Sequence, residues 1–104
     1  MSCTENIEIT SAEEQLSDAQ YKKLVNAGIQ GDSFSQFELG TLYEHADYVD
    51  KNLTEALRWY HLAAEQGNVM AQYNVAVMYM NGSGTAKDLN EAVKWYRLAA
   101  DQGY

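Results

Sequence analysis

The stretch RWYHLAAEQG at residues 58–67 returns near the end of the chain as KWYRLAADQG at 94–103. The two stretches lie 36 residues apart, and residues 32–67 align with 68–103 at this spacing without a gap. Thirteen of the aligned positions are identical. A repeat of this length is typical of an array in which small helical units stack on one another.

The first half of each repeat is predicted to form a helix, here called helix A. It follows Asp32 in the first copy and Asn68 in the second, and both residue types are good N-caps. The segments 45–50 and 81–84 are rich in turn formers and are expected to end the two helices. In the second copy, apolar side chains recur at the spacing of one buried helical face: Ala71, Val75, Met78 and Tyr79.

The second half of each repeat is predicted to form another helix, helix B. It follows Asn52 or Asp88, and a Glu three residues later completes the pattern of a capping box. Gly67 and Gly103 are expected to end it, because glycine adopts the left-handed conformation at low cost. The expected buried side consists of Ala56, Trp59, Tyr60 and Ala63, and of Ala92, Trp95, Tyr96 and Ala99. The expected polar stripe of the first copy consists of Thr54, Arg58, His61 and Glu65.

The segments AQYNVAVMYMNGSG (71–84) and DLNEAVKWYRLAADQG (88–103) resemble the Sel1-like repeat, a relative of the tetratricopeptide repeat. This resemblance implies an all-α fold, an α/α superhelical solenoid whose members scaffold protein complexes without catalytic residues. The first copy departs from the pattern at Ser35, Ala46 and Tyr48, so a different loop path is expected there. The matching framework positions are Ala71, Gln72, Val75, Ala76, Tyr79, Gly82, Ala92, Trp95, Tyr96, Ala99, Ala100 and Gly103.

The chain is expected to divide into a leader with a capping helix at 1–31, a first repeat at 32–67 and a second repeat at 68–104. The segment LVNAGIQGD (24–32) is a weaker version of YHLAAEQGN (60–68), which suggests a further helix B. This helix is predicted at about 12–29. Its N-terminal signal is either Ser17 with Gln20 or Ser11 with Glu14.

The sides of the two A helices that point away from the predicted core are the candidate partner-binding surface. In the second copy they carry apolar side chains where polar ones would be expected on a solvated face. By resemblance, helix A lines the concave surface of the superhelix. The alternative is that these residues pack under the N-terminal helix. The candidate residues are Phe34, Phe37, Thr41 and Glu44, and Met70, Tyr73, Val77 and Met80.

The last predicted helix offers a second candidate surface, around Val93, Tyr96 and Ala100. The sequence as given ends at Gly103-Tyr104, where a further helix A would be expected to begin. Repeat arrays need neighbouring units or polar caps to cover their apolar sides. A second copy of the chain, forming a homodimer, or another partner is therefore expected to cover this side.

The chain is acidic, with 15 acidic and 7 basic side chains and a net charge of −8. This charge repels a phosphate backbone, so direct binding to nucleic acid is not expected, and a protein partner is expected to be basic. An alternative function is that of a small acidic inhibitor that blocks a basic, nucleic-acid-binding surface of an enzyme. It would act through Asp32, Glu38, Glu44, Asp47 and Asp50, and salt would weaken it steeply.

No catalytic or cofactor-binding pattern is found in the sequence. His45 and His61 lie on different predicted elements without neighbouring ligands at metal-binding spacing, so no metal site is expected. The single Cys3 cannot form an internal disulfide, and there is neither a signal-peptide pattern nor an apolar run of membrane-spanning length. The sequence therefore predicts a cytoplasmic protein that is not an enzyme and that binds neither membranes nor cofactors.

Overall fold

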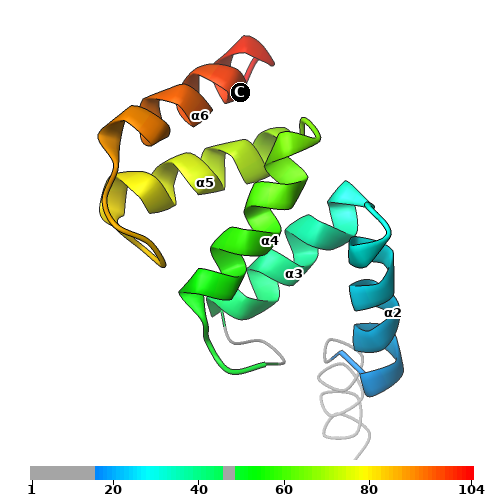
Figure 1. The fold of residues 1–104 in the computed structure, drawn as a ribbon. Coiled ribbons are helices and arrows are strands. Elements are labelled where there is room, and N and C mark those ends of the chain that lie inside the picture. Colours follow the sequence, from blue (N-terminus) through cyan, green and yellow to red (C-terminus); the bar gives the residue numbers. More distant parts are fainter. Residues whose placement is uncertain (1–15, 46–48) are drawn as a thin grey trace, which may run out of the picture.

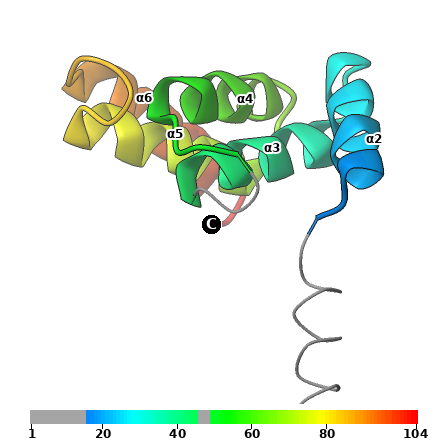
Figure 2. The ribbon, with the colours of Figure 1, turned by 90° about the horizontal axis from the view of Figure 1, so that it is seen from below.

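The computed structural model describes residues 16–45 and 49–104, and this part of the chain forms five α-helices. Figure 1 shows them following one another from α2, in blue, to α6, in red, and Figure 2 shows the same succession along the long axis. The molecule is elongated, with extents of 55 × 27 × 27 Å. The predicted all-α solenoid is confirmed. Its helices are α2 (Asp18–Ile29), α3 (Ser33–His45), α4 (Leu53–Glu65), α5 (Val69–Asn81) and α6 (Leu89–Asp101).

Helix α2 starts later than predicted. Ser17 is extended, with φ −82° and ψ 162°, so the helix begins at Asp18 and not near residue 12. The Ser17 hydroxyl accepts the amide of Gln20, and the Gln20 side chain accepts the amide of Ser17, which is a complete capping box. Of the two predicted signals, Ser17 with Gln20 is therefore the one that caps α2. Ser11 with Glu14 lies outside the described residues.

The other helices begin where their caps predict. The side chains of Asn52, Asn68 and Asp88 each accept the backbone amide three residues later. Asp32 does the same for Ser35, whose hydroxyl also donates to the Asp32 carboxylate. The predicted capping boxes of α4 and α6 are only half formed, because the N-cap amides of Asn52 and Asp88 donate to the carbonyls of Tyr43 and Tyr79, each at 2.9 Å. The Glu55 carboxylate pairs with Arg58 at 2.9 Å.

The core lies between successive helices and contains the residues that the repeat pattern predicts. Trp59 and Trp95 are 6% and 4% exposed, and the alanines beside them let the helices approach closely. Tyr60 is 1% exposed, whereas its counterpart Tyr96 is only half-buried, so the prediction of a buried tyrosine is correct in one copy and only in part in the other.

Two buried glutamines join each layer to the next. The Gln36 side chain donates to the carbonyl of Gly28 in α2 at 2.9 Å, and Gln72 donates to Ala64 in α4 at 3.1 Å. Each also accepts a bond from a glutamine 30 residues later, Gln66 or Gln102. Since buried polar groups require partners, this arrangement fixes the position of each helix A against both neighbouring helices.

The loop after α5 packs against the start of α4. Gly84 has φ +74°, and a Cβ placed there would collide with the backbone carbonyl of Leu53, so only glycine fits. Thr54 also donates to the Gly84 carbonyl at 3.3 Å. The different loop path predicted from Ala46 and Tyr48 lies outside the described residues.

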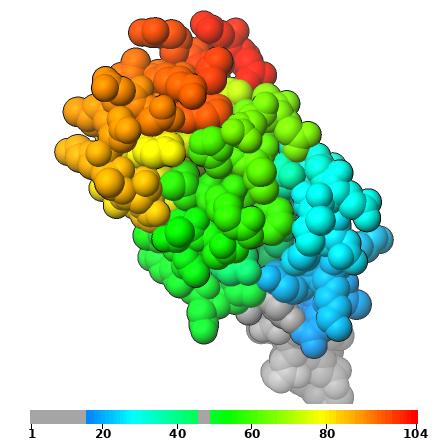
Figure 3. All heavy atoms as spheres, viewed as in Figure 1, coloured from blue at the N-terminus to red at the C-terminus, as the bar shows by residue number. Residues whose placement is uncertain are grey.

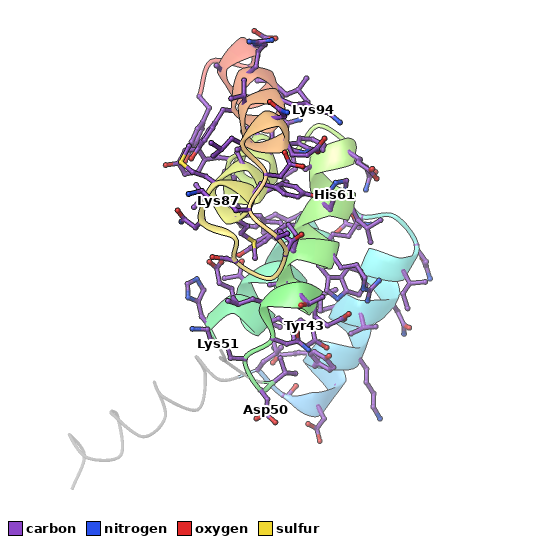
Figure 4. The ribbon with its side chains drawn as sticks, turned by 60° about the vertical axis from the view of Figure 1, so that its left-hand side comes forward. Tyr43, Asp50, Lys51, His61, Lys87 and Lys94 are labelled. Carbon is purple, nitrogen blue, oxygen red and sulfur yellow. The ribbon has the colours of Figure 1, made fainter. Side chains whose placement is uncertain are left out.

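One member of the predicted polar stripe is not simply solvated. His61 is half-buried, with its ring 5.2 Å from the ring of Trp95 in α6. Figure 4 shows His61 on the side of α4 that faces α6. His61 therefore differs from the exposed residues Thr54, Arg58 and Glu65 of the polar stripe, because the next repeat partly covers this part of α4.

Candidate protein-binding surface

The eight predicted residues on α3 and α5 are here called the helix A surface. Four of them are exposed apolar or aromatic side chains: Phe34 is 62% exposed, Met70 49%, Met80 40% and Tyr73 39%. Large exposed apolar side chains are typical of surfaces that bind other proteins. The other four residues of the set are half-buried.

Tyr60 of α4 contacts three of the four helix A surface residues on α3. Its hydroxyl donates to Glu44 at 2.6 Å and to Thr41 at 3.4 Å, and its ring lies 5.6 Å from that of Phe37. These three residues are therefore not simply outward-facing, as the helical wheel predicted, because a side chain from α4 reaches over the edge of α3. Burial and the bond to Glu44 raise the pKa of Tyr60, so its hydroxyl remains a donor at neutral pH.

On α5, the exposed residues join an aromatic cluster with the end of the chain. The Tyr73 ring lies 5.6 Å from the ring of Tyr96 and 5.2 Å from that of Tyr104. The Tyr96 hydroxyl points to the Met80 sulfur at 3.9 Å. This cluster presents polarisable and aromatic groups, which adapt well to different ligands.

A groove lies between α2 and α3 and is here called the α2–α3 groove. It has a volume of about 600 Å³. Three residues of the helix A surface, Phe34, Phe37 and Thr41, line it together with α2. The alternative considered from the sequence, that these residues pack beneath the N-terminal helix, therefore holds only in part, because a groove remains open between the two helices.

Sequence reasoning missed this groove, although the sequence carried a signal for it. Residues 23 and 24 are Lys and Leu, where the repeats have Trp59-Tyr60 and Trp95-Tyr96. Helix α2 therefore lacks the Trp-Tyr pair that packs against helix A in the repeats. Lys23 and Leu24 both line the groove.

The acidic residues of the alternative inhibitor hypothesis do not form one free cluster in the described part of the chain. Asp32 accepts bonds from the Ser35 side chain and backbone, which lower its pKa. Glu44 accepts the Tyr60 hydroxyl. Glu38 lines the α2–α3 groove, Asp50 is exposed, and Asp47 lies outside the described residues.

The second predicted surface, here called the α6 face, consists of Val93, Tyr96 and Ala100. In α4 the equivalent residues Leu57 and Ala64 are 8% and 1% exposed, because α5 packs over them. Val93 is 50% exposed and Ala100 is exposed as well. Figure 3 shows α6, in orange and red, at one end of the molecule.

Across 16–45 and 49–104, no three His, Cys, Asp or Glu side chains come together as a metal site would require. No helix in that part of the chain has the length and apolar character needed to cross a bilayer.

The fold and the surface define a class of protein, an α/α repeat solenoid whose framework repeats and whose outer residues vary. The model of the Sel1 repeat matches residues 33–68 and 69–104. The chain therefore belongs to the Sel1 repeat family. Members of this family generally act as scaffolds for protein–protein interactions and are generally non-catalytic.

Solved structures of Sel1 proteins are similar to the chain. A Sel1 repeat protein from Oxalobacter formigenes is 38% identical, with a TM-score of 0.79 over 94% of this chain and 40% of that one. A protective antigen of uropathogenic Escherichia coli with an SLR fold is 35% identical, with a TM-score of 0.76 over 83% of this chain and 18% of that one. The chain thus spans less than half the length of both relatives.

A third structure is similar in fold. Cysteine rich protein B of Helicobacter pylori is 22% identical, with a TM-score of 0.81 over 94% of this chain and 74% of that one. Among curated proteins, the sequence comparison gave no match.

Proposed function

We propose that this protein is a non-catalytic adaptor that binds another protein through the helix A surface. The observation that carries the proposal is the exposure of Phe34, Met70, Tyr73 and Met80 on two helices of the same kind. Exposed aromatic and Met side chains on helices of the same kind favour a binding role. The acidic charge favours a basic partner, and the single cysteine favours a reducing, cytoplasmic location.

The test is affinity capture from the native cell with the full chain as bait. The variant Phe34→Ser with Tyr73→Ser removes two exposed rings without opening the core, and we expect it to lose the captured partner. Phe37→Ala is less suitable, since Phe37 also supports Tyr60. A matched control, Ile29→Ser with Leu89→Ser, removes two side chains that are 70% and 55% exposed elsewhere. Unchanged capture by the folded double variant would remove the helix A surface from consideration.

The same capture separates the adaptor from the acidic inhibitor. At about 0.1 M salt the Debye length is about 10 Å, and added salt weakens the attraction between exposed charges further. Apolar contacts are not weakened in this way. We therefore expect capture by the helix A surface to persist as the salt concentration rises. A partner that is a nucleic-acid-binding enzyme and is released steeply by salt would favour the inhibitor instead.

A further inference from the structure

The position equivalent to the α2–α3 groove in the next layer lies between α4 and α5. There, side chains fill the space. The 36-residue spacing relates Leu24, Glu38 and Leu42, which line the groove, to Tyr60, Asn74 and Met78. Tyr60 and Met78 are 1% and 3% exposed, and Asn74 hydrogen-bonds to Tyr60. Leu24 and Leu42 are only half-buried, and Glu38 is exposed.

The two layers differ because α3 packs beside α4, whereas no described helix packs in the same way beside α2. Helix α3 supports Tyr60 through Phe37, Thr41 and Glu44, and thereby closes the space beside α4. In the described part of the chain, no helix stands in the equivalent position beside α2. The groove is therefore the place of an additional helix A.

We propose that this groove binds one amphipathic α-helix of a partner protein, which takes the position of the additional helix A. The inference rests on the proposed adaptor function and names the form of its ligand. The apolar wall is formed mainly by Leu16, Leu24, Ala27, Phe34, Phe37 and Leu42. It fits apolar side chains at positions i, i+3 or i+4, and i+7 of a helix.

An extended peptide is a poor ligand for this groove, because its backbone groups would need partners there. The Thr41 hydroxyl already donates to the Phe37 carbonyl at 3.0 Å, and the Gln20 side-chain oxygen already accepts the Ser17 amide at 2.9 Å. A helix satisfies its backbone hydrogen bonds internally, so it can enter an apolar groove without this loss.

The charges on the two walls define the flanks of the ligand helix. Lys23 lies on the α2 wall and Glu38 on the α3 wall, and both side chains are exposed. A ligand with an acidic residue on one flank and a basic residue on the other complements both walls. The groove is also continuous with the α3–α4 interface, since Phe37 lines the groove and contacts Tyr60.

The test is an NMR titration of the ¹⁵N-labelled full chain with a capped synthetic peptide of residues 33–45. This peptide is the helix that fills the equivalent place in the next layer. We expect saturable shifts of amides in 16–27 and 34–42, and helical transferred NOEs in the peptide. The same peptide carrying Leu39→Pro cannot form the helix and should not bind. Absent shifts, shifts confined to α5 and α6, or equal binding of the proline peptide would overturn the proposal.

Variants of the full chain locate the binding site independently. Leu24→Glu places a charge in the groove and should weaken peptide binding at least about tenfold, because the carboxylate would lose its water. Phe34→Ser, at a residue 62% exposed, provides the same test without disturbing the core. Leu89→Glu, on α6 and 55% exposed, is the control and should bind normally. Normal binding by both groove variants would contradict the assignment.

Other occupants have separate signatures in the free chain, and either would overturn the proposal of a partner helix. NOEs between Leu24 and Ile7 or Ile9 would show that the chain's own N-terminal residues fill the groove. Shifts of groove amides with protein concentration would show a second copy there. In the capture experiment, Tyr73→Ser alone tests the helix A surface independently of the peptide titration, because Tyr73 does not line the groove.

Discussion

Gly40 allows Tyr60 to lie against the backbone of α3. A Cβ at Gly40 would stand 2.6 Å from two ring atoms of Tyr60, which is too close for any real contact. The second repeat has Ala76 at this position, and there the counterpart Tyr96 is only half-buried. One methyl group thus contributes to the different environments of the two tyrosines.

We expect Gly40→Ala to destabilise the protein by up to about 2 kcal/mol. The gain in helix propensity is about 1 kcal/mol, whereas forcing a buried ring aside costs about 1–3 kcal/mol or more. Denaturant unfolding followed by circular dichroism measures the change. The reverse substitution, Ala76→Gly, is the control and should also destabilise, by about 1 kcal/mol, because no ring needs the space. A Gly40→Ala protein more stable than the wild type would contradict this account.

Tyr21 is expected to make the stability of the protein depend on alkaline pH. Its hydroxyl lies 3.0 Å from that of Tyr43, and burial followed by this hydrogen bond raises the pKa of Tyr21 from 10.0 to about 12. Figure 4 labels Tyr43, which belongs to α3 and meets α2 through this contact. A raised pKa in the folded state means that the unfolded chain releases its proton first.

The contribution of Tyr21 to stability is therefore complete below about pH 10 and is lost as the pH rises through about 12. We expect the free energy of unfolding of the wild type to fall more steeply over this window than that of Tyr21→Phe, which has no hydroxyl to titrate. Urea unfolding at a series of pH values measures both slopes. Parallel slopes would mean that the Tyr21–Tyr43 contact does not govern this pH dependence.

At the scale of the helices, the buried glutamines set the spacing of the layers. Gln72 is 4% exposed and bridges α4, through the Ala64 carbonyl, to the end of α6, through Gln102. The repeat pattern places a glutamine at positions 36 and 72, but only the tertiary structure shows that each one contacts two other helices. A hydrophobic residue of similar size would fill the space without making these bonds.

We expect Gln72→Leu to lower the free energy of unfolding by about 1–3 kcal/mol, because buried partners are left with fewer hydrogen bonds. Gln102→Ala removes one bond from an exposed side chain and is the matched control, with an expected loss below about 1 kcal/mol. Thermal or denaturant unfolding compares the two variants. Equal losses in the two variants would indicate that the burial of Gln72 does not increase its contribution to the free energy of unfolding.

At the scale of the whole molecule, the two ends of the array differ. The α2–α3 groove is an open space between two helices, whereas Val93 and Ala100 of the α6 face lie on a side of α6 that no other described helix covers. Leu57 and Val93 are equivalent in the repeat, yet they are 8% and 50% exposed, because α5 packs on α4 and nothing described packs on this side of α6. The position of a residue in the array therefore decides its exposure.

If a second copy covers the α6 face, the full chain should sediment as a dimer at high concentration, and Val93→Glu should make it monomeric. Burying an unpaired carboxylate in such an interface is strongly unfavourable. Leu98→Glu changes a residue 39% exposed on another side of α6 and should leave the dimer intact. Analytical ultracentrifugation gives the masses. A wild type that remains monomeric at every concentration would exclude the homodimer.

The sequence by itself determined the helices and their core. Caps such as Asn52 and Asp88, terminating glycines, and the periodic Trp, Tyr and Ala residues act within one or two turns of a helix, so local patterns are sufficient to predict them. The start of α2 was the exception, because two capping signals competed and both were compatible with the pattern. The resemblance to the Sel1 repeat added the superhelical stacking.

Only the tertiary structure decided which outer residues are available. Phe34 and Phe37 lie on the same helix, and the sequence could not tell them apart as surface residues. Tyr60 from α4 contacts Phe37 and leaves Phe34 exposed, and this contact depends on the space above Gly40. Exposure, unlike helix formation, depends on side chains distant in the sequence. For the same reason the sequence did not predict the α2–α3 groove, which depends on how α2 and α3 pack against each other.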